Sequence, residues 1–165
     1  MGLFGKKPQE KVDELYGKSL TLYNLGRYHE AIECCNKVLE IDPKHVNALS
    51  SKGSMLQTIG KHEEAIVWID KALEINPKHG GALNNKGFAL YKFGRYSEAI
   101  TYYDKVLEIE PKQVVALNNK GLAIDKLGKY EEAIEWYDKA LEIEPDHIGV
   151  LHNKGIALDK LKNSG

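Results

Sequence analysis

Asparagine residues recur in pairs along the sequence, at Asn84–Asn85 and Asn118–Asn119, and Asn153 stands in a looser copy of the same stretch. An amide side chain offers both donors and an acceptor, so it can pair with the N–H and C=O groups of an extended peptide. Asparagine is also a poor helix former. If helices hold these residues, contacts with a ligand would offset that cost.

Motifs typical of catalysis or metal binding do not occur in the sequence, which has no glycine-rich phosphate loop, no HExxH and no CxxC. His45, His79 and His147 stand about one repeat apart, too far from one another for a shared metal ion. Recurring carboxylates such as Glu98 and Glu132 suit exposed ion pairs with a lysine one helical turn later. We therefore predict a protein that is not an enzyme, with no catalytic residues, no metal site and no cofactor.

Composition limits the class of partner. The 165 residues include 23 Lys plus Arg and 24 Asp plus Glu, a formal net charge of -1 without a basic block. Nucleic acid is thus excluded as the primary partner, because phosphate binding needs concentrated positive charge. No apolar run approaches the roughly 18 residues of a membrane helix, and no signal-peptide core precedes the rest. We expect no membrane association and a cytoplasmic location.

The two cysteines, Cys34 and Cys35, are adjacent. Adjacent side chains on a helix point about 100° apart. We expect one core thiol and one surface thiol rather than a disulfide.

A period of 34 residues organises the chain. Prolines 43, 77, 111 and 145 follow it, and so do glycines 26, 60, 94 and 128 and alanines 31, 65, 99 and 133. The predicted organisation is a flexible tail at 1–11, one solenoid domain at 12–162 and a second tail at 163–165. The domain comprises repeats 12–45, 46–79, 80–113 and 114–147 and a closing helix at 148–162. The third and fourth repeats agree at 21 of 34 positions.

Each repeat is predicted to form two helices. In the third repeat these cover 81–93 and 97–110. The first ends at a glycine suited to the left-handed conformation, and the second ends before a proline. No segment alternates like a half-buried strand.

A helix–turn–helix unit of this length, with small residues at repeat positions 8 and 20 and proline at 32, resembles the tetratricopeptide repeat (TPR). The third repeat carries the signature residues Leu83, Gly87, Leu90, Ala99, Tyr103, Val106 and Pro111. The fourth carries Leu117, Gly121, Ile124, Ala133, Tyr137, Ala140 and Pro145. The resemblance implies an all-α, right-handed superhelical solenoid of stacked antiparallel helix pairs, with four full repeats and a C-terminal closing helix. Position 7 departs from the family, because it is Lys in every copy where the family usually has Leu.

A helical wheel separates two faces of the first helix of each repeat. Positions 3, 4, 7, 8, 10, 11 and 14 form the packing side. Positions 2, 5, 6, 9, 12 and 13 form the opposite arc, which the resemblance assigns to a concave groove. The candidate peptide-binding residues are Asn84, Asn85, Phe88, Tyr91, Lys92, Asn118, Asn119, Leu122, Asp125, Lys126, His152, Asn153, Ile156 and Lys160.

The resemblance implies a protein–protein interaction module, an adaptor or assembly factor, that binds an extended or helical peptide of a partner. The lysines of the groove favour an acidic segment or a terminal carboxylate. Two alternatives stay open. The protein is a structural repeat protein that self-associates, for example as a homodimer, through its terminal helix or through Leu3 and Phe4 of the tail. Otherwise it is a regulatory TPR partner of a separate enzyme.

The lysine at position 7, for example Lys86, lies within the apolar arc of the wheel. We expect its aliphatic stem to pack there while its ammonium reaches the surface. The expected partner is a repeated carboxylate such as Glu98 or Glu108.

Overall fold

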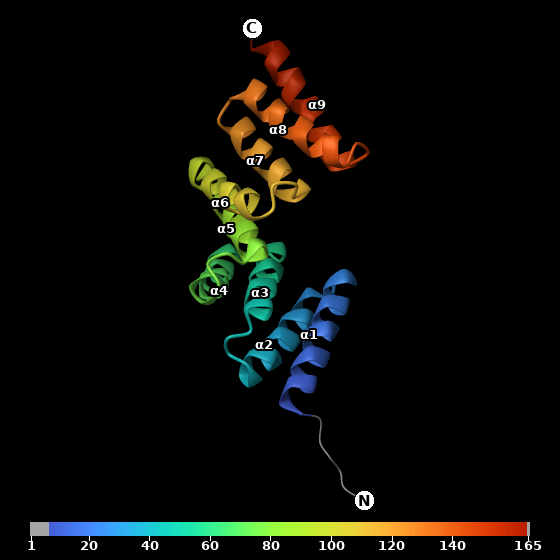
Figure 1. The fold of residues 1–165 in the computed structure, drawn as a ribbon, viewed down its shortest axis with the longest axis vertical. Helices are drawn as coiled ribbons and strands as arrows, with labels where there is room; N and C mark the ends of the chain where they lie inside the picture. The colour runs from blue at the N-terminus through green and yellow to red at the C-terminus, as the bar shows by residue number, and fades with distance from the viewer. Residues whose placement is uncertain (1–6, 165) are drawn as a thin grey trace, which may run out of the picture. The chain divides into compact units, whose positions relative to one another are not determined.

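The structure is a computed structural model that describes residues 7–164. These residues form nine helices and no strand (Figure 1). The helices are α1 (Pro8–Asn24), α2 (Tyr28–Ile41), α3 (Val46–Thr58), α4 (His62–Ile75), α5 (Gly80–Lys92), α6 (Tyr96–Ile109), α7 (Val114–Lys126), α8 (Tyr130–Ile143) and α9 (Ile148–Asn163). The fold is an all-α helical repeat solenoid. The prediction that Leu3 and Phe4 dock in a neighbouring groove lies outside the described residues.

The predicted helix boundaries agree with the structure to within one residue in the third repeat, where α5 and α6 replace the expected 81–93 and 97–110. The glycines that end the first helices, Gly26, Gly60, Gly94 and Gly128, have φ between 72° and 81°, as the sequence predicts. Residues 8–11, which the sequence assigned to the tail, are helical, because α1 begins at Pro8. Proline suits this first position, since its missing N–H needs no partner there.

The chain separates into two compact units, Met1–Asn85 and Lys86–Gly165, with the boundary inside α5. In the first unit, α2 packs against α1 and α3, and α3 packs against α4. In the second unit, α7 packs against α6 and α8, and α8 packs against α9. Within residues 7–164, no helix is both long enough and apolar enough to cross a membrane.

A glycine at repeat position 8 lets the two helices of a repeat approach closely. A Cβ atom on Gly121 would lie 2.6 Å from Cε1 of Tyr137, and one on Gly87 would lie equally close to Tyr103. In the first unit, Ile69 occupies the same place opposite Gly53. Both tyrosine rings are buried. The signature glycine and tyrosine of the third and fourth repeats therefore meet in the core.

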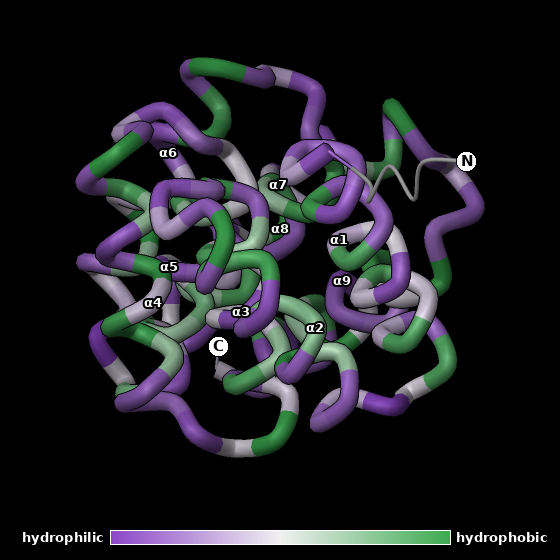
Figure 2. The backbone as a smooth tube through the Cα atoms, turned by 90° about the horizontal axis from the view of Figure 1, so that it is seen from below, coloured by the Kyte–Doolittle hydropathy of each residue, from purple (hydrophilic) through white to green (hydrophobic). Residues whose placement is uncertain are grey.

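The helices are amphipathic, because each contains both hydrophobic and hydrophilic residues (Figure 2). The packing side differs from the wheel at position 14, because Phe93 and Leu127 are 43% and 42% exposed. This position lies at the helix end, beside the turn. Cys34 and Cys35 are both buried, so the expected surface thiol is wrong. Cys34 packs with Leu22 and Ala31, whereas Cys35 donates to Oγ of Ser19 at 3.4 Å.

The histidines at repeat position 34 cap the helices that follow them. Nδ1 of His45, His79 and His147 accepts the backbone N–H of Ala48, Ala82 and Val150, respectively. Oε1 of Gln113 accepts the N–H of Ala116 in the same way, at 2.7 Å. The bond satisfies one of the free N–H groups at a helix start. The sequence showed the recurrence of these histidines but not their role.

We predict that Gly121→Ala destabilises the protein by about 1–3 kcal/mol, because the added Cβ forces the buried Tyr137 ring to move. Chemical denaturation followed by circular dichroism measures the change. Gly17→Ala is the matched control. Nothing lies within 4 Å of a Cβ atom at Gly17 in α1, so this variant should gain up to about 1 kcal/mol from helix propensity. An unchanged Gly121→Ala variant would contradict the close contact.

We predict that the cap at His79 makes stability depend on pH. Burial lowers the pKa of His79 below its usual value of about 6.5. The stabilisation that comes from keeping His79 neutral is complete above about pH 6.5. It is lost as the pH falls further, because the unfolded chain then binds a proton at His79 more readily than the folded chain does. His79→Gln, which copies Gln113, should reduce the drop in melting temperature between about pH 7.5 and about pH 5. His29→Gln, at an exposed site in α2, serves as the control, and identical profiles for wild type and His79→Gln would refute the prediction.

Candidate functional site

The structure gathers seven of the predicted binding residues around one hollow in the second unit. The hollow has a volume of about 140 Å³ and lies on the face that α7 and α9 share. Its lining residues are Tyr91, Leu122, Asp125, Lys126, Asn153, Ile156 and Lys160, together with Tyr137 from α8. Tyr137 was absent from the predicted set, because its position 24 belongs to the core in the TPR pattern.

Asp125 is the most unusual residue of this hollow. It is only 7% exposed, and its Oδ2 atom accepts from Nζ of Lys160 at 2.5 Å. Its Oδ1 atom is buried, and no donor among the described residues reaches it. A buried acceptor without a donor costs free energy. An N–H or O–H group that donates to Oδ1 would remove this cost.

The two tyrosines of the hollow stay neutral at physiological pH. Burial raises the pKa of Tyr137 and of Tyr91, and the nearby Asp125 carboxylate raises both further. Neither side chain therefore adds a charge to the hollow.

The asparagines are half-buried and bond to neighbouring repeats, which the sequence analysis did not foresee. Nδ2 of Asn153 donates to Oδ1 of Asn118 at 2.9 Å. In the first unit, Nδ2 of Asn85 donates to the carbonyl oxygen of Ser50 at 3.3 Å. In each pair, position 6 of one repeat meets position 5 of the repeat before it. The amides thus tie adjacent repeats together and keep only part of their hydrogen-bonding capacity for a ligand.

The remaining predicted residues lie away from the hollow. Asn84 and Asn119 are half-buried, and both have bonding partners. Phe88 stacks on Tyr91 with ring centroids 6.5 Å apart, and Nζ of Lys92 lies 5.3 Å from the Phe88 ring. His152 is exposed on α9.

A similar hollow in the first unit was not predicted. It has a volume of about 120 Å³ and is lined by Leu20, Tyr23, Ser51, Ser54 and Met55 of α1 and α3. Leu20, Tyr23, Ser51 and Ser54 lie at groove positions of the helical wheel, but the candidate set came from the later repeats, which carry the asparagine pairs. Serines and a methionine gave no comparable signal.

A larger and more open hollow, of about 680 Å³, lies over α6 and α8. Leu107, Leu117, Trp136 and Ile143 supply its apolar lining. None of the candidate residues lines it, because the helical wheel covered only the first helix of each repeat.

The lysine at repeat position 7 contacts a ring and a carboxylate beside this larger hollow. Nζ of Lys120 lies 3.6 Å from the Trp136 ring centroid and 2.5 Å from Oδ1 of Asp104. Lys154 pairs with Asp138 at the same distance. In the first unit, Nζ of Lys52 lies 3.4 Å from the centroid of Trp68, and burial lowers its pKa. A repeated carboxylate was expected as the partner of this lysine, and Lys120 and Lys154 have one, the aspartate at repeat position 25. The glutamates named as examples do not supply it for these two lysines.

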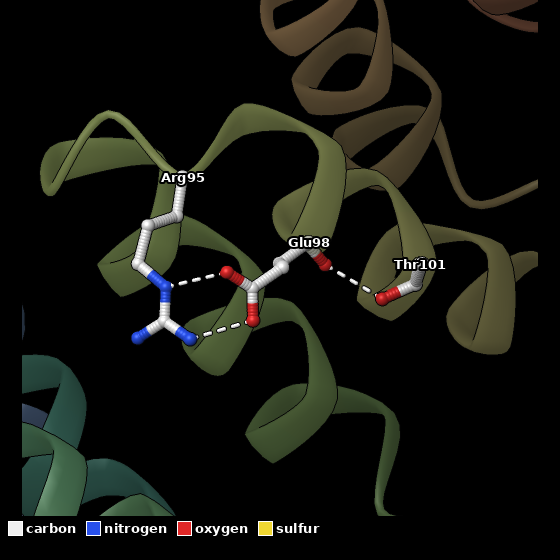
Figure 3. A network of polar contacts seen from close by, with 3 residues as sticks. All are labelled: Arg95, Glu98 and Thr101. Carbon is white, nitrogen blue, oxygen red and sulfur yellow. Dashed lines mark hydrogen bonds and ion pairs between the residues drawn. The ribbon is translucent and has the colours of Figure 1, made fainter.

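The recurring glutamates at position 19 pair with the residue three before them. Arg95 donates to both carboxylate oxygens of Glu98, at 2.6 and 2.5 Å, and Thr101 donates to the Glu98 carbonyl oxygen (Figure 3). Lys129 pairs with Glu132 at 3.3 Å. The expected lysine one turn later is therefore wrong. These pairs are exposed, and pairs of this kind contribute little to stability.

No group of three His, Cys, Asp or Glu side chains within residues 7–164 is placed to hold a metal ion.

Comparisons with known proteins agree with this architecture. The family described as "Tetratricopeptide repeat" matches residues 114–147, and the family described as "Anaphase-promoting complex, cyclosome, subunit 3" matches residues 24–106. The first match has the same boundaries as the fourth predicted repeat. No curated protein matches the chain.

Solved structures with the same fold include pilF of Pseudomonas aeruginosa, with a TM-score of 0.85 and 26% identity over 96% of this chain and 72% of the other. YrrB, a TPR protein with an unusual peptide-binding site, has a TM-score of 0.72 and 26% identity over 87% of this chain and 74% of its own. MamA has a TM-score of 0.74 and 24% identity over 93% and 84% of the two chains, which supports the fold alone. With the repeat pattern and the stacked helix pairs, these matches show that the chain belongs to the tetratricopeptide repeat proteins.

Proposed function

We propose that this protein is an adaptor or assembly factor that holds a peptide segment of a partner protein on the face shared by α7 and α9. The TPR fold in general supports protein–protein interaction, and TPR proteins are generally interaction modules rather than enzymes. The peptide-binding site of YrrB, a similar structure, gives the proposal further support.

The observation that carries the proposal is the hollow around Asp125. Its Oδ1 atom has no donor among the described residues and no exposed surface, so a peptide N–H group supplies the missing donor once the side chains around the hollow move aside. Ile156, which is 41% exposed at the rim, offers an apolar contact for a neighbouring side chain. A peptide that lies along this face meets both requirements at once.

The charge of the partner peptide is a separate part of the proposal. Nζ of Lys160 is already paired with Asp125, and Lys92 lies over the Phe88 ring. Lys126 is exposed and free to meet a carboxylate in an acidic or C-terminal segment. We retain that preference and assign it mainly to Lys126, within a cytoplasmic setting.

The two alternatives, self-association and regulation of a separate enzyme, differ in the surface or the partner that they require. Self-association would use the exposed apolar residues of α9, such as Ile148 and Leu151. Sedimentation at several concentrations distinguishes it, because a monomer throughout contradicts it. A regulatory partner of an enzyme would use the same face as an adaptor, so only the identity of the partner separates these two roles.

We predict that peptides selected from a random display library against the whole protein lose at least tenfold in affinity on Ile156→Asp. The carboxylate would place an unpaired charge in the apolar contact. Isothermal titration with the selected peptides measures the loss, and their sequences report the charge preference. The matched control is Ile109→Asp in α6, because Ile109 is also 41% exposed but lies away from the hollow. Equal affinities for Ile156→Asp and wild type would exclude this face as the binding site.

A further inference from the structure

The last helix, α9, leaves uncovered the residues that are buried in the equivalent helices. At repeat positions 4 and 11, Leu151 and Leu158 of α9 are 47% and 38% exposed. Their counterparts in α7, Leu117 and Ile124, are 3% and 1% exposed. The difference arises because α8 covers α7, whereas no second helix follows α9 within the described residues.

Gly155, at position 8 of α9, marks the same difference. A Cβ atom on Gly121 of α7 would collide with the Tyr137 ring, but nothing lies within 4 Å of one on Gly155. The space that receives an aromatic ring in two other repeats is thus open at α9.

Lys154, the residue before Gly155, is also placed to contact an aromatic ring. In α7, Lys120 contacts the Asp104 carboxylate of the preceding helix and the Trp136 ring of the following helix. In α9, Lys154 keeps the equivalent contact with Asp138 at 2.5 Å. No aromatic ring among the described residues takes the place that Trp136 has over Lys120. The carboxylate therefore already holds the ammonium where a ring would stack on it.

Neither outer helix, α1 nor α9, offers a suitable occupant in a second copy. Helix α9 has no Phe, Tyr or Trp, so pairing two α9 helices brings no such ring to Gly155. Helix α1 of a second copy would present Glu14, Lys18 and Thr21 at positions 3, 7 and 10. All three are exposed and polar, which does not suit an apolar face.

We propose that the exposed face of α9 is a docking site for an amphipathic helix of a partner protein. The helices that fill this place elsewhere define the chemistry of the partner. In α8, Ala133 is followed by Trp136 and Tyr137 and then by Ala140, and in α6 the same positions hold Ala99, Tyr102, Tyr103 and Val106. The partner helix carries a small residue, two adjacent aromatic residues three and four positions later, and Ala or Val seven positions later. Its second ring enters the space at Gly155, and its first ring lies against Lys154.

A peptide with the sequence of residues 129–145 tests the proposal. It is labelled with a fluorophore and held helical by a lactam bridge on its outer face, and its binding to the full chain is followed by fluorescence anisotropy. We expect saturable binding. Replacing the two residues of the peptide that correspond to Trp136 and Tyr137 by alanine should weaken binding at least tenfold. Absence of binding to the wild-type protein overturns the proposal.

Variants of the protein locate the bound peptide. Gly155→Ala puts a methyl group where the ring must enter, so we expect at least a tenfold loss of peptide affinity with an equal or higher melting temperature. Gly17→Ala makes the same change at an open site of α1 and should leave the affinity unchanged. Unchanged affinity in Gly155→Ala contradicts the assigned position. A dimer in sedimentation that Gly155→Ala dissolves would instead identify a second copy as the occupant and overturn the proposed partner helix.

Discussion

The architecture depends on one contact, which in the second, third and fourth repeats joins a glycine of the first helix to a bulky side chain of the second. In the first repeat Ser19 and Cys35 take these two positions. Gly121 and Tyr137 make it in the second unit, and Gly53 and Ile69 make it in the first. Because no Cβ separates the helices, the ring fills the layer between them, and Leu117 and Ile124 are buried beside it. Tyr137 also lines the hollow that α7 and α9 share, so the core contact shapes the candidate site.

Polar side chains connect the repeats that this contact creates. Asn153 donates to Asn118 across one junction, and Lys154 pairs with Asp138 across the same one. Half-buried polar groups need such partners. The helix cost of asparagine is therefore offset first by bonds within the protein, and a ligand uses what remains. A polar residue that recurs across repeats suits either contact between repeats or ligand binding. Its burial and the distances to its partners distinguish the two roles.

The first and last helices differ in a way that bears on function. Helix α1 has polar residues at its packing positions 3, 7 and 10, as expected for a terminal helix that faces solvent. Helix α9 has exposed leucines and an open glycine instead. Within residues 7–164 the two outer helices therefore differ. Stacking α9 of one copy on α1 of an identical copy would place an apolar face on a polar one, which disfavours that arrangement.

The sequence by itself determined the 34-residue period, the helix pairs, the glycine turns and the residues of the core contact. These features follow from local backbone preferences and from periodicity, which are properties of neighbouring residues. The tertiary structure alone decided that Lys120 pairs with Asp104 of the preceding helix, that both cysteines are buried, and that no described residue donates to Oδ1 of Asp125. Each of these depends on side chains from different helices. A helical wheel gives the direction of a residue around its own helix, but not what the neighbouring helix places opposite it.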